Sequence, residues 1–130
     1  MSNSNIFSLT EITLNAGGID ANWSHDSRFI AVTSNSETAQ LFDLNGNIVA
    51  ELKADKNSNF SHFILVANFH PSRPLIVTGL TDGTARLWNF SGQELAVMRG
   101  HQGDVINANF TPDGSGILTF SLDGTVRVWD

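Results

Sequence analysis

The sequence repeats itself with a period of about 41 residues, and this feature constrains the fold more than any other. Residues 66–89, which contain VANFHPSRPLIVTG and TDGTARLWN, match residues 107–130, which contain NANFTPDGSGILTF and LDGTVRVWD. A weaker third copy, with DANWSHDSRFIAVT and TAQLFD, occupies residues 20–43. Periods of this length are typical of propellers, solenoids and other repeat arrays.

Alternating apolar and polar residues predict β-strands within each copy. In the last copy, short alternating stretches at 106–110, 117–120 and 126–130 are divided by the turn sequences PDGSG and SLDG. The stretches 45–52 and 91–98 begin with a glycine turn and supply a fourth strand. Each copy is therefore expected to be a four-stranded antiparallel meander. Because both of its faces are apolar, it needs a neighbour on each side.

Residues 100–130, GHQGDVINANFTPDGSGILTFSLDGTVRVWD, resemble a complete WD repeat from its Gly-His start to its Trp-Asp end. The resemblance covers nearly the whole chain and implies an all-β fold, a WD-repeat β-propeller with three blades per chain. In that family a buried His, a strand Thr, a turn Asp and a strand Trp form one hydrogen-bonded set. The resemblance places this set on His101, Thr119, Asp123 and Trp129.

The other two copies retain less of this set. The second copy keeps three members, Thr78, Asp82 and Trp88, but has Phe60 in place of the histidine. The first copy has Val32, Ser36 and Phe42 at the corresponding positions. We therefore expect a complete network in the third blade and a partial one in the second, and the first copy is the most degraded. Loss of a single member should cost about 1–3 kcal/mol, because a buried polar group loses its partner.

The two ends of the chain are complementary. The third copy stops after its third strand, whereas NIFSLTEI at residues 5–12 precedes the first copy and alternates like a fourth strand. We expect four segments along the chain: an orphan fourth strand at 1–14, then blades at 15–53, 54–99 and 100–130. The N-terminal strand of another protomer would then complete the last blade and remove its free edge.

Three blades are too few for a ring, since propellers typically have about 4–8. Two chains supply six blades and three chains supply nine, so we favour a ring-closing homodimer over a trimer. The alternative is that the chain is a fragment or half of a larger propeller that binds a small molecule or peptide at the channel mouth.

Composition excludes several classes of function. Thirteen acidic residues against seven Lys and Arg give a net charge of −6, which disfavours nucleic acid as a partner. The chain has no cysteine, so a reducing compartment fits best. The N-terminus has no basic segment followed by an apolar run, and no stretch is long enough to span a bilayer. These features predict a cytoplasmic protein without a membrane partner.

Catalytic and metal sites are not indicated. The four histidines show no ligand spacing, which argues against a metal, and the DGT triplets are better explained as tight turns than as cation-binding loops. No Ser-His-Asp set can be assembled from residues that the blades do not already use. We therefore expect no enzyme activity and no cofactor. The WD resemblance instead implies a non-catalytic scaffold for protein–protein contacts.

The expected contact face is the one where the loops between blades and the second-to-third-strand turns emerge. The candidate residues on it are Asp20, Leu80, Thr81, Asp104 and Leu122. Leu80 and Leu122, interpreted as occupying equivalent turn positions, are the candidate apolar anchors. Arg86 and Arg127 both precede the Trp by two residues. They are expected either to face solvent or to hold an acidic protein partner with their forked guanidinium groups.

Overall fold

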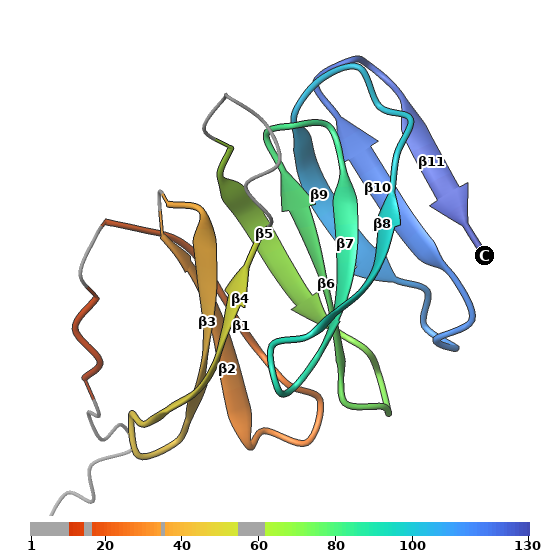
Figure 1. The fold of residues 1–130 in the computed structure, drawn as a ribbon. Coiled ribbons are helices and arrows are strands. Elements are labelled where there is room, and N and C mark those ends of the chain that lie inside the picture. Colours follow the sequence, from red (N-terminus) through yellow and green to blue (C-terminus); the bar gives the residue numbers. More distant parts are fainter. Residues whose placement is uncertain (1–10, 15–16, 35, 55–61) are drawn as a thin grey trace, which may run out of the picture.

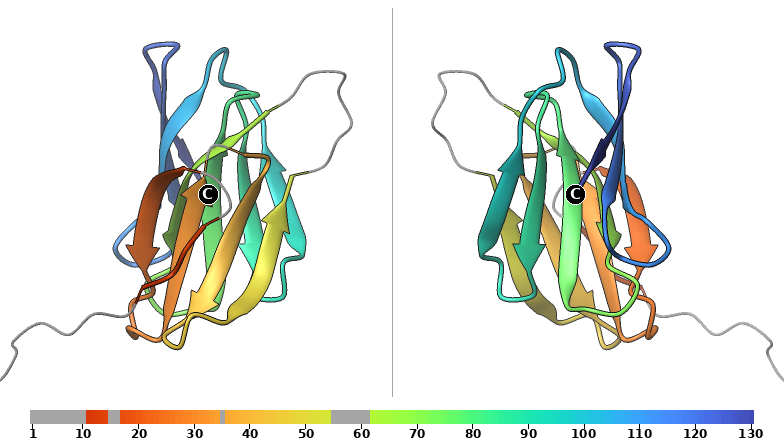
Figure 2. Two further views of the ribbon diagram at one scale, coloured as in Figure 1. Left: turned by 90° about the vertical axis from the view of Figure 1, so that its left-hand side faces the viewer. Right: turned by 90° about the vertical axis from the view of Figure 1, so that its right-hand side faces the viewer.

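The computed structural model describes residues 11–14, 17–34, 36–54 and 62–130. All regular structure within these residues is β-strand, in three antiparallel sheets. The sheets stand side by side in chain order (Figure 1), and they overlap when viewed along the stack (Figure 2). The predicted all-β class, with stacked antiparallel blades, is confirmed.

Each sheet is a meander in which neighbours in the sequence are neighbours in the sheet. Blade 1 contains β1 (Gly18–Trp23), β2 (Phe29–Ser34), β3 (Thr38–Asp43) and β4 (Ile48–Lys53). Blade 2 contains β5 (Ile64–Phe69), β6 (Leu75–Leu80), β7 (Ala85–Asn89) and β8 (Glu94–Met98). Blade 3 contains β9 (Val105–Phe110), β10 (Ile117–Ser121) and β11 (Val126–Trp129). Within the described part of the chain, β11 pairs only with β10.

Glycine makes the tight turn between the second and third strands of blades 2 and 3. Gly83 and Gly124 occupy equivalent positions and both have φ of 84°, a conformation that side chains disfavour. At Gly83 a Cβ would also lie 2.7 Å from the carbonyl oxygen of His101. The DGT triplet of blade 2 is therefore a turn that packs closely against the segment leading into blade 3.

The hydrophobic core lies between the sheets, in two clusters. The cluster between blades 1 and 2 includes Leu41, Leu52, Ile64, Phe69, Ile76, Leu80 and Trp88. The cluster between blades 2 and 3 is built on Val66, Val77, Ala108 and Ile117. Among the described residues, only blade 2 thus has a neighbouring sheet on both faces, as expected for repeats that cannot bury their own surface alone.

The segment predicted as an orphan fourth strand is described only at residues 11–14, where it forms no strand. Ile12 lies beside Gly46 and Leu14 beside Gly18, so this part of the segment contacts blade 1. The other residues of the predicted strand lie outside the described part of the chain. Its pairing with β11 of another protomer stays a prediction.

Candidate protein interaction surface

Blade 3 contains a continuous chain of hydrogen bonds whose central member is buried. The indole N–H of Trp129 donates to Thr119 Oγ1 at 2.9 Å, and Thr119 Oγ1 lies 2.7 Å from His101 Nε2. His101 Nδ1 lies 3.1 Å from a carboxylate oxygen of Asp123. Because the carboxylate can only accept, Nδ1 carries the proton and Nε2 accepts from the threonine hydroxyl. The structure thus brings together all four side chains expected to form the network.

Asp123 also holds the turn that follows β10. It accepts from the Thr125 hydroxyl at 2.6 Å, from the Thr125 backbone N–H at 2.8 Å and from the Gln102 backbone N–H at 2.9 Å. The Thr125 hydroxyl, followed by the other hydrogen bonds, holds the pKa of the Asp123 carboxyl far below its usual range. The carboxylate therefore stays charged at neutral pH and ties the turn to the segment entering the blade.

Blade 2 keeps part of the same network. The Trp88 indole N–H donates to Thr78 Oγ1 at 2.9 Å, as in blade 3. The Phe60 position lies outside the described residues. Asp82 accepts from the Thr84 hydroxyl at 2.6 Å, and its other oxygen lies 2.9 Å from Arg86 Nη2. Arg86 thus occupies the role toward the turn aspartate that His101 has in blade 3.

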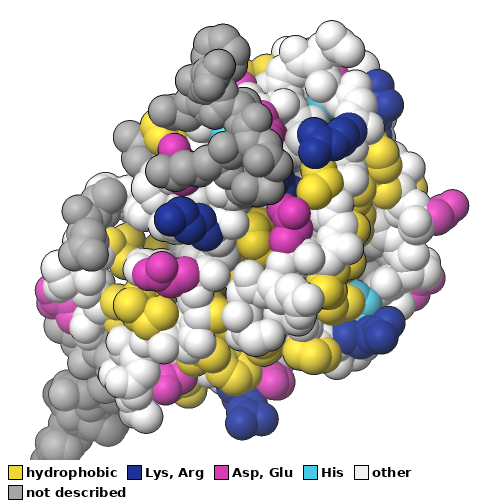
Figure 3. Space-filling model, in the orientation of Figure 1, with side chains coloured by type: hydrophobic (Ala, Val, Ile, Leu, Met, Phe, Trp, Pro, Cys, Tyr) yellow, Lys and Arg dark blue, Asp and Glu magenta, His cyan; other side chains and the backbone are white. Residues whose placement is uncertain are grey.

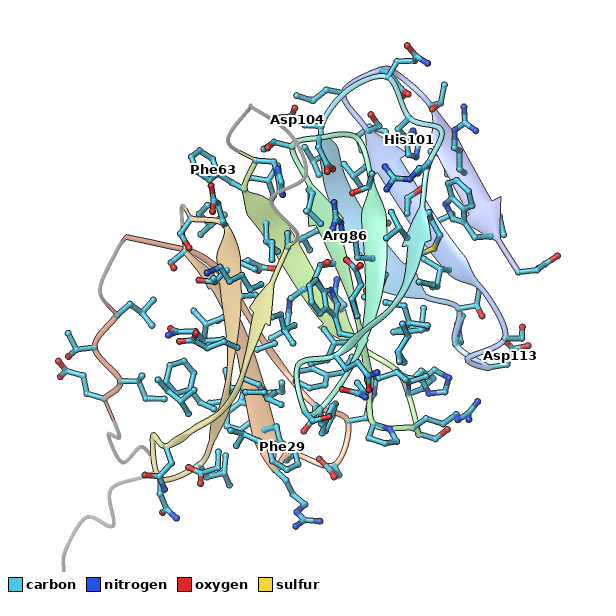
Figure 4. All side chains as sticks on the ribbon, viewed as in Figure 1. Phe29, Phe63, Arg86, His101, Asp104 and Asp113 are labelled. Atoms are coloured by element: carbon cyan, nitrogen blue, oxygen red, sulfur yellow. The ribbon has the colours of Figure 1, made fainter. Side chains whose placement is uncertain are left out.

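Arg86 is buried, at 4% exposure, which contradicts both roles predicted for it. Its guanidinium bonds to Asp82, Thr84 and, through Nη1 at 2.8 Å, Glu94 on β8 (Figure 4). Burial alone would raise the pKa of Asp82, but the hydrogen bonds from Thr84 and the charge of Arg86 outweigh it and lower that pKa. Arg86 therefore stabilises the blade and is not available to a partner. Arg127, its counterpart, is exposed and lies beside Gly100.

Leu80 is fully buried between blades 1 and 2, so its prediction as a partner anchor is wrong. At the repeat spacing of 41, Leu80 corresponds to Ser121, and it is Thr81 that corresponds to Leu122. Successive strand residues point to opposite faces, so this error of one residue turns Leu80 inward. Leu122 is 67% exposed and could still meet a partner.

The remaining candidates lie at the same end of the molecule and are half-buried. Thr81 Oγ1 accepts from the Phe63 backbone N–H at 2.8 Å, and the carbonyl of Asp104 accepts from the Leu122 N–H at 2.9 Å. Asp20 accepts from the Asn22 amide at 2.9 Å. The first two contacts fasten the loops between blades to the turns at this end, whereas the Asp20 contact lies within β1. Their role in partner binding stays a prediction.

A repeated asparagine between blades was missed in the sequence, although it follows the repeat spacing. Asn22 on β1 donates to the Ala67 carbonyl at 2.9 Å, and Asn68 on β5 donates to the Ala108 carbonyl at 2.7 Å. Each bond joins the first strand of one blade to the first strand of the next. A polar residue recurring at the same strand position in successive copies was the signal that pointed to it.

The recesses among the described residues include two that could hold a small ligand. One of about 390 Å³ opens between blades 1 and 2, at the end where Phe29 lies and opposite Asp104 (Figure 4). Phe29, Phe69 and Phe90 form its floor, with Arg28 and Arg73 among its lining residues. The other, of about 460 Å³, runs along β1, β5 and β9, the wall that would face the channel of a ring. Binding of a small molecule or peptide at the channel mouth stays a prediction.

The described residues offer little support for other kinds of site. They contain no group of three or more His, Asp or Glu side chains that could hold a metal ion. Among these same residues no helix is long and apolar enough to cross a membrane. On the side of the molecule shown in Figure 3, Lys and Arg side chains lie singly and do not form a basic patch.

Comparison with known proteins agrees with the repeat structure. The model of the family described as "WD domain, G-beta repeat" matches residues 54–89 and 92–130, more than half of the chain. Jouberin of Mus musculus and Jouberin of Rattus norvegicus are each 31% identical to the chain over 87 residues, which is 66% of the chain. The chain spans only 8% of the length of either relative. By its matched repeats and its stacked antiparallel sheets, the chain belongs to the WD40 repeat family.

Proposed function

We propose that this chain is a non-catalytic scaffold for protein–protein contacts, which self-associates through its uncovered blade faces to close a ring. Membership of the WD40 family supports the scaffold role. The observation that carries self-association is the outer face of blade 3. It presents four apolar side chains that are 40–68% exposed: Leu118, Phe120, Val126 and Val128.

These four residues form one continuous patch, because Leu118 pairs with Val128 and Phe120 pairs with Val126 across β10 and β11. Their counterparts in blade 2, 41 residues earlier, lie on the face that blade 3 covers: Val77, Gly79, Ala85 and Leu87. The patch therefore corresponds to the face with which blade 2 meets blade 3. Contiguous exposed apolar surface of this kind marks interaction sites.

Ring closure would use both ends of the chain. The outer face of blade 3 takes up a further blade, and residues 1–14 of the neighbouring protomer supply the missing fourth strand beside β11. Two protomers then give six blades, within the range of about 4–8 that propellers adopt. We place this assembly in the cytoplasm and assign it no cofactor.

Light scattering coupled to gel filtration tests the proposal. The chain mass is 14.1 kDa, so the dimer should weigh twice that, and a nine-bladed trimer three times. Val128→Glu places a charge on the patch and should reduce the mass to that of one chain. Leu95→Glu is the matched control, because Leu95 is also exposed, at 47%, but lies on blade 2. A wild-type mass of 14.1 kDa at all concentrations refutes self-association.

A further inference from the structure

We infer that the outer face of blade 3 receives the outer face of blade 1 of a second copy, so that copies join head to tail. The inference rests on the proposed self-association and specifies its joint. Blade 3 would contact the second copy as blade 2 contacts blade 3. Corresponding residues follow from the repeat spacing: blade 1 positions lie 46 residues before those of blade 2 and 87 before those of blade 3.

The asparagine bonds between blades indicate a missing acceptor. Asn109 occupies in blade 3 the place of Asn68 in blade 2, whose amide bonds to the next blade at 2.7 Å. In this structure Asn109 is exposed and donates only within its own strand, to Asn107 Oδ1 at 3.1 Å. An amide nitrogen has two hydrogens. One N–H of Asn109 therefore has no acceptor among the described residues.

Asn22 shows how both hydrogens are used where a next blade is present. It donates one to Asp20, two residues earlier in its strand, at 2.9 Å and the other to the Ala67 carbonyl of blade 2, also at 2.9 Å. The blade 1 residue that corresponds to Ala67 is Ala21. Ala21 is exposed on β1, an edge strand. In the head-to-tail joint, Asn109 donates to the Ala21 carbonyl of the second copy.

Side-chain size at the joint favours blade 1 as the occupant. At one contact of the joint between blades 2 and 3, the blade 2 residue is Gly79 and the blade 3 residue is Val105. A Cβ on Gly79 would lie 2.6 Å from the Val105 carbonyl oxygen and 2.9 Å from Val105 Cγ1. The blade 3 residue that corresponds to Gly79 is Phe120, 41% exposed. A neighbour with valine at the facing position would clash with this ring. The facing residue of blade 1 is Gly18, which has no side chain to clash with the ring. Its backbone carbonyl remains, as that of Val105 does opposite Gly79, so the joint must be wider at this contact than the joint between blades 2 and 3.

The apolar surfaces also match. Between blades 2 and 3, Val77 and Leu87 lie in one cluster with four blade 3 residues: Ala108, Phe110, Ile117 and Trp129. The blade 1 residues that correspond to these four are all apolar: Ala21, Trp23, Ile30 and Phe42. Trp23 is 59% exposed, so it can supply a large contact area to Leu118 and Val128 of the other copy.

Docking requires a rearrangement at the start of the chain. Leu14 Cδ1 lies 3.4 Å from the place of a Cβ on Gly18, which is part of the space that Phe120 would enter. Residues 11–14 therefore leave the outer face of blade 1 when a second copy docks.

Complementary substitutions at the Phe120 contact test the inference. Gly18→Val should weaken dimerisation at least tenfold, because the new side chain meets Phe120 of the other copy in each of two joints. Adding Phe120→Gly to the same chain recreates the Gly79 and Val105 pair of the blade 2–3 joint and should restore the dimer. Gly17→Val is the matched control, since nothing lies within 4 Å of a Cβ there. Circular dichroism checks that each variant is folded.

Mixing two defective chains tests the direction of the joint. Trp23→Glu and Val128→Glu should each give monomers alone, whereas an equimolar mixture should give heterodimers with one intact joint. If two copies paired blade 3 against blade 3, Trp23→Glu would still dimerise and the mixture would show no rescue. Asn109→Ala should weaken the wild-type dimer roughly fivefold per joint, against no effect for Asn45→Ala in an exposed turn.

The results separate the inference from the proposal on which it rests. A wild-type dimer that Val128→Glu disrupts but Gly18→Val and Trp23→Glu leave intact overturns the head-to-tail joint and keeps self-association. If the wild-type chain stays monomeric at every concentration and instead binds a blade from a different protein, both the head-to-tail joint and self-association are overturned. Loss of the dimer in Gly18→Val together with its recovery in the double variant supports both.

Discussion

The buried guanidinium of Arg86 should be one of the largest single electrostatic contributions to the stability of the chain. Its side chain is 5% exposed and bonds to Asp82 and Glu94 at 2.9 and 2.8 Å. Replacement by methionine keeps the apolar stem but leaves two carboxylates without their shared cation. Removing one partner of a buried pair costs about 3–5 kcal/mol.

That figure must be reduced, because the carboxylates of Asp82 and Glu94 are 25% and 30% exposed and water can solvate them. We expect Arg86→Met to lower the free energy of unfolding by about 2 kcal/mol at pH 7. For a chain of this size the melting temperature should fall by roughly 6–8 °C. Arg127→Met, the same change at the equivalent exposed position of blade 3, should cost less than about 0.5 kcal/mol.

The effect of Arg86→Met should depend on pH. The pKa of Asp82 is lowered from 3.8 in the folded protein, so its ionised form stabilises the fold above pH 3.8, and this stability is lost as pH falls through the folded value. The gap between wild type and Arg86→Met should therefore be full at pH 7 and narrow below pH 3.8. Urea unfolding followed by circular dichroism, at one fixed protein concentration, measures it. Equal stability of Arg86→Met and Arg127→Met at pH 7 would refute the reasoning.

Three further substitutions test the other contacts, each read by urea unfolding. Thr119→Val should cost about 2–3 kcal/mol, because it leaves both His101 Nε2 and the Trp129 indole N–H without a partner. Thr78→Val removes the partner of the Trp88 indole N–H and a long bond of 3.5 Å to the Arg86 carbonyl, and should cost about 1–2 kcal/mol; equal effects would argue against the longer chain in blade 3. Asn68→Ala should cost about 1 kcal/mol through the lost bond to the Ala108 carbonyl, and a value indistinguishable from that of Asn45→Ala would contradict this. Leu80→Asp should cost more than about 3 kcal/mol, whereas Leu122→Asp should leave stability within about 0.5 kcal/mol of wild type; similar stabilities would mean that Leu80 is not in the core.

The repeat and its alternation were sufficient to predict the fold class. Strand and turn residues recur at fixed offsets, so one legible copy at residues 100–130 assigned the strands of the two weaker copies. The side chains of the blade 3 network were identifiable from the resemblance to a WD repeat, and the donor and acceptor roles of these residue types are consistent with that assignment. The repeat shows which residues of the three copies are equivalent, and this equivalence is enough to predict how the strands pair.

Burial of individual residues was harder to predict, because repetition does not report what a side chain contacts. Arg86 and Arg127 hold the same position, yet the first is buried against Asp82 and Glu94 and the second is exposed, since blade 3 has no fourth strand among the described residues to supply a glutamate. Leu80 was misassigned by one residue. On a strand, a shift of one residue moves a side chain from the solvent-exposed face to the buried face.

The outer faces of blades 1 and 3, which no other blade covers among the described residues, are the most informative about function. Inside the stack, each contact pair has been matched within one chain: Gly79 with Val105, Asn68 with the Ala108 carbonyl. On the outer face of blade 3, Phe120 and Asn109 occupy the same contact positions, but no described residue of a following blade packs against them. The apolar patch of blade 3 and the unused N–H of Asn109 are features of a contact surface rather than of a surface that faces only water. In the proposed joint the residues that meet Phe120 and Asn109 are Gly18 and Ala21, which lie in the first blade of the same chain, and this is why we propose a second copy as the partner.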